Sequence, residues 1–236
     1  SVAEAAPENF DGDVPELARR IQDAWLAFHC GSFEEAVSLS LNCGLLAHAC
    51  ANKSAGIYAF HLESSESVQH QCYMDAIERA EQAIAVFPDD ANSHYFRAFN
   101  LGRYGQSISI LEALKRGMAG KIHESLSATL ELEPDHAEAH TAMGMYHAEI
   151  INKVGKMIGG MTYGASIKAA ETHLEQAVEL TPASPIAHIE YANGLYLLYG
   201  DKRIDEVTSL YITASEMQPR DAMEQLDVLW ALSELE

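Results

Sequence analysis

One pattern of residues occurs three times in this chain, and it constrains the fold more than any other feature. The pattern is a proline, a histidine six positions later and a small residue four positions after that. The three copies are Pro88–His94–Ala98, Pro134–His140–Gly144 and Pro182–His188–Ala192. The residues before each proline also match at fixed intervals, and a fourth copy of this upstream half ends at Pro219. An internal repeat of this kind predicts a stack of similar units.

Each copy is predicted to be a helix, a turn and a second helix. Before Pro88, the residues Ala76, Ala80 and Ala83 recur with the three-and-four spacing of one helical face. The proline ends that helix because its ring and its missing N–H cannot continue the hydrogen-bond ladder. Asp or Ser residues follow the repeat prolines, and these residue types cap helix starts. The small residues Ala98, Gly144 and Ala192 are expected where two helices cross closely.

These residues resemble the tetratricopeptide repeat (TPR), and an earlier copy over residues 25–36 (WLAFHCGSFEEA) matches that family well. The resemblance covers about residues 14–219 and implies an all-α superhelix of helical hairpins, here with about 11 to 13 helices. The repeat prolines lie 46, 48 and 37 residues apart. Because the usual period is about 34 residues, we expect insertions between the two helices of a repeat.

Two groups of irregular repeat proteins show a closer resemblance. Residues 102–106 (GRYGQ) and the long inter-helix insertions are similar to the TPR component associated with TRAP (tripartite ATP-independent periplasmic) transporters in bacteria. The regulators of microtubule dynamics share similar irregular repeats. The first resemblance implies an extracytoplasmic helper that docks a solute-binding protein, holds an apolar carboxylate ligand and forms an oligomer.

The repeat pattern predicts one domain after a short tail. The tail is residues 1–13, and the TPR-like domain spans residues 14–236. The predicted repeats cover residues 14–45, 46–88, 89–134, 135–182 and 183–219, with a capping helix over residues 221–235. The two predicted insertions cover residues 105–120 and 155–164. No run shows the period-two alternation of a strand.

The composition restricts the classes of partner. The chain has 15 Lys and Arg residues against 35 Asp and Glu residues, a net charge of −20. This charge argues against nucleic acid and anionic membrane surfaces as general partners. Charged and polar residues interrupt every apolar segment well short of a membrane span, so membrane insertion is not predicted. The segment from 97 to 168 is nearly neutral and suggests where a carboxylate-bearing ligand would bind.

The cysteines and the N-terminus bear on the compartment. Cys30, Cys43, Cys50 and Cys72 lie in the first third with no zinc-site spacing. Free thiols are the favoured interpretation, and one or two disulfides the alternative if the protein is exported. The chain begins at Ser1, and residues 1–7 are small and Ala-rich. Such a segment is typical of a tether after a cleaved signal or lipid anchor, which favours a periplasmic location over a cytoplasmic one. The alternative is that Ser1 is a cloning boundary.

The candidate binding residues fall into two sets. Polar residues on the first helices of the repeats, where the TPR family lines its concave groove, are Asn100, Arg103, Gln106, Asn152, Lys153, Asn193 and Tyr196. Asn in mid-helix is unfavourable and needs a reason, either ligand contact or hydrogen bonds to a neighbouring helix. The candidate insertion contacts are Met118, Met157, Met161 and Tyr163. These residues form either a flexible contact surface or a filling for the core.

No pattern points to catalysis, a cofactor or a metal. The sequence has no nucleophile elbow, Walker loop, dinucleotide fingerprint or HExxH motif. Equivalent histidines of a solenoid lie about 10 Å apart, too far to share one ion, so His94, His140 and His188 are expected to pack between helices.

Two functional hypotheses therefore follow. The favoured one is a non-catalytic helical-repeat scaffold for protein–protein interaction, with a transport-associated role that docks a solute-binding protein and holds an apolar carboxylate. The alternative is a cytoplasmic assembly adaptor that binds an extended peptide in the concave groove.

Overall fold

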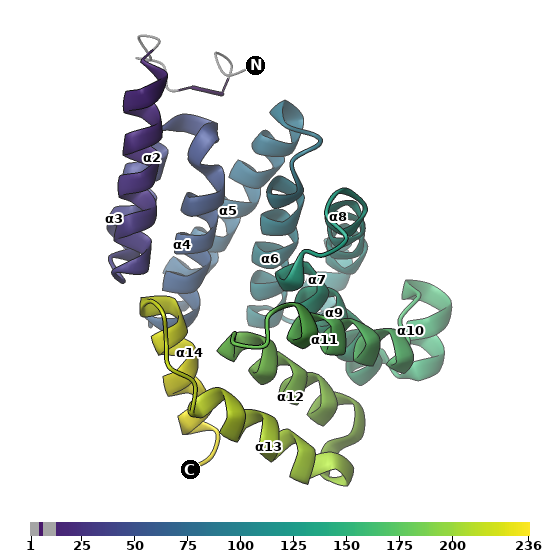
Figure 1. Cartoon of the computed structure of the whole chain (residues 1–236). Helices are drawn as coiled ribbons and strands as arrows, with labels where there is room; N and C mark the ends of the chain where they lie inside the picture. Colours follow the sequence, from purple (N-terminus) through teal and green to yellow (C-terminus); the bar gives the residue numbers. More distant parts are fainter. Residues whose placement is uncertain (1–4, 7–12) are drawn as a thin grey trace. The chain divides into compact units, whose positions relative to one another are not determined.

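The computed structural model describes residues 5–6 and 13–236, and within these it consists of helices joined by short turns (Figure 1). The predicted all-α, TPR-like fold is confirmed. Most of the predicted tail, residues 1–13, lies outside the described residues. The helices group into two compact units, Ser1–Leu132 and Glu133–Glu236, which we call unit 1 and unit 2. The single domain and its repeat boundaries stay predictions.

In unit 1 the helices from α2 to α6 each pack on the one before, and α8 packs on α6. Its α-helices are α2 (Val14–His29), α3 (Phe33–Leu41), α4 (His48–His61), α5 (Glu66–Val86), α6 (Ala91–Ser107), α7 (Ile110–Lys115) and α8 (Met118–Leu132). A 3-10 turn, η1 (Gly44–Ala47), precedes α4. Helix α4 packs on α3, α5 and α6, and small residues on several of its faces are buried. This is the TPR arrangement, in which a first helix contacts both its own second helix and the next first helix.

Unit 2 repeats this arrangement. Its α-helices are α9 (Ala137–Val154), α10 (Lys156–Tyr163), α11 (Ile167–Leu180), α12 (Pro185–Tyr199), α13 (Ile204–Ser215) and α14 (Ala222–Ser233), with the 3-10 turn η2 (Gly200–Arg203). Helices α9 and α11 form one pair, and α12 and α13 form the next. Helix α12 packs on α9 and α11, and α14 packs on α12 and α13.

The repeat prolines end helices as predicted. Helices α5, α8 and α11 each stop two residues before Pro88, Pro134 and Pro182. The caps that follow are partly different from those expected. Asp90 caps α6, and its side chain accepts a hydrogen bond from the Ser93 N–H. At the second boundary His136, rather than Asp135, is the cap, because its ring Nδ1 accepts a hydrogen bond from the Ala139 N–H.

The repeat histidines hold the turns that precede their helices. Nε2–H of His94 donates to the carbonyl oxygen of Pro88 at 2.8 Å, and His140 makes the same bond to Pro134 at 2.8 Å. His188 donates from Nδ1 to the carbonyl oxygen of Ser184 at 3.1 Å, since Pro185 changes the turn there. The shared spacing thus places a ring nitrogen beside a carbonyl oxygen of the turn that precedes each helix.

A leucine between two glycines forms the centre of unit 2. Leu174 of α11 is fully buried. A Cβ atom added to Gly144 of α9 would lie 2.5 Å from Leu174, and one added to Gly194 of α12 would also lie 2.5 Å from it. Neither helix can carry a side chain at these positions without displacing the leucine. The predicted close crossing at Gly144 is therefore confirmed.

The cysteines are free thiols. Cys30 is exposed, Cys72 is half-buried, and Cys43 and Cys50 are buried. Burial raises the pKa of the Cys50 thiol. In the described part of the chain, no helix is both long enough and apolar enough to span a membrane.

Candidate interaction surfaces

The predicted groove residues of α6 divide into a structural residue and an accessible pair. Asn100 is fully buried, and its Nδ2 donates to the carbonyl oxygen of Phe96 at 3.0 Å. Arg103 is half-buried and places its guanidinium 4.0 Å from the ring centroid of Phe60 on α4. Gln106 is exposed and accepts a hydrogen bond from Arg103 at 3.3 Å. Arg103 and Gln106 are the residues of this set that a partner can reach.

The groove residues predicted on α9 and α12 show the same division. Asn193 is held inside unit 2, because its Nδ2 donates to Glu190 and its Oδ1 accepts from the hydroxyl of Tyr211. Lys153 is exposed and forms an ion pair with Glu149 one turn earlier. Asn152 is exposed, and Tyr196 is 51% exposed. A binding role for the accessible residues stays a prediction. The bond between Asn193 and Tyr211 of α13 matches the structural alternative, whereas Asn100 bonds to Phe96 within its own helix.

The insertion residues lie in two different environments. Met118, at the start of α8, is buried beside Leu101 and Tyr104 in the core of unit 1. Met118 therefore fills the core, as the second interpretation of the insertions expected, and an external partner cannot reach it. In unit 2, Met157 and Met161 are 74% and 85% exposed. Tyr163 is half-buried, and its backbone carbonyl accepts a hydrogen bond from the hydroxyl of Tyr146.

Helix α10 turns Gly159 inward and its large apolar side chains outward. A Cβ atom added to Gly159 would lie 3.3 Å from Ile150 and 3.8 Å from the Ile151 backbone, so the glycine face packs closely on α9. Gly155 and Gly164, with φ of 83° and 66°, provide the turns at its two ends. The opposite side presents Met157, Ile158 and Met161, and Ile158 is 51% exposed. We call these three residues the α10 surface.

The α10 surface lies in the one markedly basic part of unit 2. Between residues 150 and 170 the chain has three lysines, Lys153, Lys156 and Lys168, and no Asp or Glu. All three lysines are exposed. An exposed apolar patch with a charged rim is typical of a protein-binding site. The sequence indicated Met157 and Met161, but not Ile158 or the side to which Gly159 turns.

One group in unit 1 contains the residue types of a catalytic triad without its arrangement. The carboxylate of Asp90 lies 3.1 Å from Nε2 of His48, and the hydroxyl of Ser93 lies 3.3 Å from the same nitrogen. In a triad the acid and the nucleophile contact opposite ring nitrogens, so that the acid orients the base. Here the Ser93 hydroxyl donates directly to Asp90 at 2.6 Å. These residues cap α6 and link it to α4.

A pair of histidines joins α9 to α11. Nε2 of His140 donates to the Pro134 carbonyl, and in the neutral ring its Nδ1 accepts a hydrogen bond from Nδ1–H of His173 at 2.8 Å. The ring of His147 stacks on His173 with centroids 6.0 Å apart. Burial, with the nearby His140 adding to it, lowers the pKa of His173. Among the described residues, no group of His, Cys, Asp and Glu side chains is placed to hold a metal ion.

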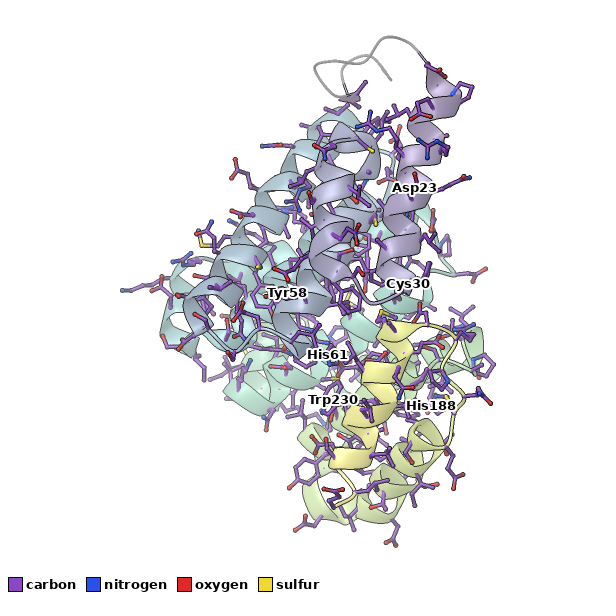
Figure 2. The ribbon with its side chains drawn as sticks, turned by 90° about the vertical axis from the view of Figure 1, so that its left-hand side faces the viewer. Asp23, Cys30, Tyr58, His61, His188 and Trp230 are labelled. Carbon is purple, nitrogen blue, oxygen red and sulfur yellow. The ribbon has the colours of Figure 1, made fainter. Side chains whose placement is uncertain are left out.

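A half-buried histidine makes the stability of unit 1 depend on pH. His61, at the end of α4 (Figure 2), has its pKa lowered to about 4 by burial and by the charge of Arg103. An unfolded chain protonates histidine near pH 6.5, so between pH 6.5 and 4 it binds a proton that the folded chain does not. Burial of His61 therefore costs no stability above pH 6.5, and it lowers the free energy of unfolding progressively as the pH falls from 6.5 to 4.

We expect His61→Gln to remove this part of the pH dependence, which is on the order of 2 kcal/mol. Urea unfolding at pH 7 and at pH 4.5 measures it, with Trp25 as the reporter of unit 1 in a Trp230→Phe background. Asp90, whose pKa is about 2, changes the stability only below about pH 3.8. Equal losses of stability on acidification in the two proteins would exclude His61 as the cause.

Comparison with known proteins agrees with this fold. The model of the family "Regulator of microtubule dynamics protein 1-3" matches residues 44–225. No curated protein matches this chain. Among solved structures, the thermophilic TPR protein TTC0263 of Thermus thermophilus is similar, with a TM-score of 0.65 and 16% identity. The match covers 92% of this chain and 99% of that one. A TPR-like repeat of this kind is consistent with a protein-interaction scaffold. The chain thus belongs to the family of regulators of microtubule dynamics, proteins 1 to 3.

Proposed function

We propose that this protein is a non-catalytic helical-repeat scaffold that binds a partner protein through the α10 surface. The observation that carries the proposal is the orientation of α10. A surface helix normally turns its apolar side chains towards the core. Helix α10 instead packs on α9 through Gly159 and leaves Met157, Ile158 and Met161 in solvent. Flexible methionine side chains suit a surface that adapts to its partner.

The lysines around the surface indicate the charge of that partner. Lys156 lies in α10 itself, and Lys153 and Lys168 lie close to it along the chain, where Lys153 is paired with Glu149; the chain as a whole has a net charge of −20. A segment with apolar anchors and acidic flanks matches both features. An anionic membrane would also attract the lysines. However, the negative charge of the rest of the chain would repel it, and only three apolar side chains would insert into it. A protein partner is therefore the favoured occupant.

Our proposal for the process in which this binding takes place rests on family membership. The family is described as regulators of microtubule dynamics. We infer that the chain contributes to that process as an adaptor, which favours the adaptor hypothesis over the transport-associated one. A docked solute-binding protein and a bound apolar carboxylate remain predictions from the sequence. Recovery of such a carboxylate from the purified protein would support the transport-associated hypothesis instead.

The test compares the proteins captured by matched variants. Met157→Gln/Met161→Gln removes the apolar anchors, and both side chains are so exposed that folding is expected to be unaffected. Ile204→Gln/Ile212→Gln changes two residues of α13 that are 42% and 43% exposed. Affinity purification from the native cells, quantified by mass spectrometry, is expected to show one partner lost by about tenfold or more only in the α10 variant. Equal recovery by all three proteins would refute the proposal.

A further inference from the structure

Helix α14 occupies the position of the first helix of a further pair. It packs on α12 and α13, as α12 packs on α9 and α11 (Figure 1). Its chain register agrees with this place, because it follows Pro219 as the other first helices follow their repeat prolines. In the completed pairs, a second helix then covers one side of the first.

The repeat register identifies the positions that a second helix covers. They are the tenth and thirteenth residues after each repeat proline. In unit 2, Gly144 and Ala192 hold the tenth position, and His147 and Leu195 hold the thirteenth; these residues are buried. Gly144 contacts Leu174 of α11, and Leu195 packs with Val207 of α13, so both positions face the second helix of their own pair. In unit 1, Ala98 and Leu101 are 2% and 5% exposed at the same positions.

In α14 these two positions are exposed and carry large apolar residues. Counted from Pro219, they are Leu229 and Leu232, which are 52% and 45% exposed. In the part of the chain that the structure describes, no helix covers them. The tenth position also differs in size, because it holds leucine where the other copies have alanine or glycine. A helix that docks here must therefore have a small residue opposite Leu229.

The charge of this segment indicates what kind of helix fits. Residues 221–236 contain five acidic residues and no Lys or Arg. Asp221 caps α14, Glu224 pairs with Arg220, and Asp227 is buried. Glu234 and Glu236 remain exposed at the end of the helix, where Glu234 accepts a hydrogen bond from the indole N–H of Trp230 (Figure 2). Carboxylates at the negative end of a helix dipole favour a cationic partner.

We propose that Leu229 and Leu232 dock a basic amphipathic helix of a partner protein, which packs on α14 as the second helix of a repeat does. This inference goes beyond the proposed function, because it adds a second surface of opposite charge. The chain around the α10 surface carries lysines and no Asp or Glu, whereas Glu234 and Glu236 follow α14, so the same segment does not suit both. A scaffold with both surfaces links two different partners.

Two synthetic peptides test the proposal on the full chain. Both have the apolar pattern of a second helix, with alanine at the place of Leu174, and they differ in having lysine or glutamate at the outward positions. Fluorescence anisotropy of the labelled peptides gives the affinities. We expect the lysine peptide to bind at least about tenfold more tightly than the glutamate peptide, and salt to weaken it.

Three variants locate the binding. Leu229→Gln/Leu232→Gln is expected to weaken the lysine peptide by about tenfold or more. Met157→Gln/Met161→Gln and Leu26→Gln/Leu41→Gln, which remove other exposed apolar residues, are expected to leave it within about twofold. This pattern is independent of whether the α10 surface binds its own partner.

Three results would overturn the proposal. The first is the absence of lysine-peptide binding, and the second is equal binding by the α14 variant and the unchanged protein. The third is an oligomer of the unchanged protein, seen by sedimentation, that Leu229→Gln/Leu232→Gln dissociates, because the occupant would then be a second copy of this chain.

Discussion

Replacing Leu174 with alanine is expected to lower the free energy of unfolding of unit 2 by about 3 to 5 kcal/mol. The side chain is fully buried and fills the space between Gly144 on α9 and Gly194 on α12. Because these positions are glycines, neither of them contributes a side chain that could fill the cavity that the alanine leaves. The free-energy cost of losing the buried methyl groups and the cost of the remaining cavity therefore add together.

The two tryptophans make this measurement specific to one unit. Trp25 lies on α2 in unit 1 and Trp230 on α14 in unit 2, so a Trp25→Phe background leaves Trp230 as the reporter in urea unfolding. Ile212→Ala is the matched control, since Ile212 is 43% exposed, and its effect is expected to stay below about 1 kcal/mol. A loss below about 1 kcal/mol for Leu174→Ala would show that the leucine does not join the helices.

Replacing Asp90 with alanine is expected to destabilise unit 1 by about 2 to 4 kcal/mol. The carboxylate accepts hydrogen bonds from the Ser93 N–H at 2.7 Å and the Ser93 hydroxyl at 2.6 Å, and it contacts His48. Alanine removes the helix cap, worth about 1 kcal/mol, and leaves buried polar groups of His48 and Ser93 without this partner.

Asp90→Ser separates these two contributions. Serine keeps a capping oxygen for α6 but loses the contact with His48, so we expect it to recover about 1 kcal/mol of the loss. Unfolding followed by Trp25 in a Trp230→Phe background gives both values. The carboxylate contribution is complete above pH 3.8 and is lost progressively as the pH falls towards 2, because His48 and Ser93 lower the pKa of Asp90 to about 2. A stability of Asp90→Ala equal to that of the unchanged protein would refute this account of the cap.

The helical pairs could be predicted from the sequence because their determinants are local. Pro88, Pro134 and Pro182 end helices wherever they occur, since proline cannot continue the hydrogen-bond ladder. The small residue at Gly144 predicted a close crossing, since a fixed register repeats the same crossing in each pair. The histidines were expected to pack, and the structure adds that their ring N–H groups hold the preceding turns.

The accessibility of the candidate residues could not be predicted in the same way. Met118 and Met161 occur in similar Gly- and Lys-bearing segments, yet one is buried beside Leu101 and the other is 85% exposed. Asn100 and Asn193 looked like groove residues, but their hydrogen bonds lie inside the units. Which side of a helix faces a neighbour depends on residues far away in the chain, and a single sequence does not state those contacts.

Photo-crosslinking from position 161 tests the proposed scaffold function most directly. A photoreactive amino acid replaces Met161 in the native cells, and a second protein carries it at Ile204, which is 42% exposed on α13. The account predicts one discrete protein adduct from position 161 that position 204 does not form, and its loss when Met157 is also changed to Gln. An absence of adducts from position 161, or the same adducts from both positions, would contradict the assignment of the α10 surface as the binding site.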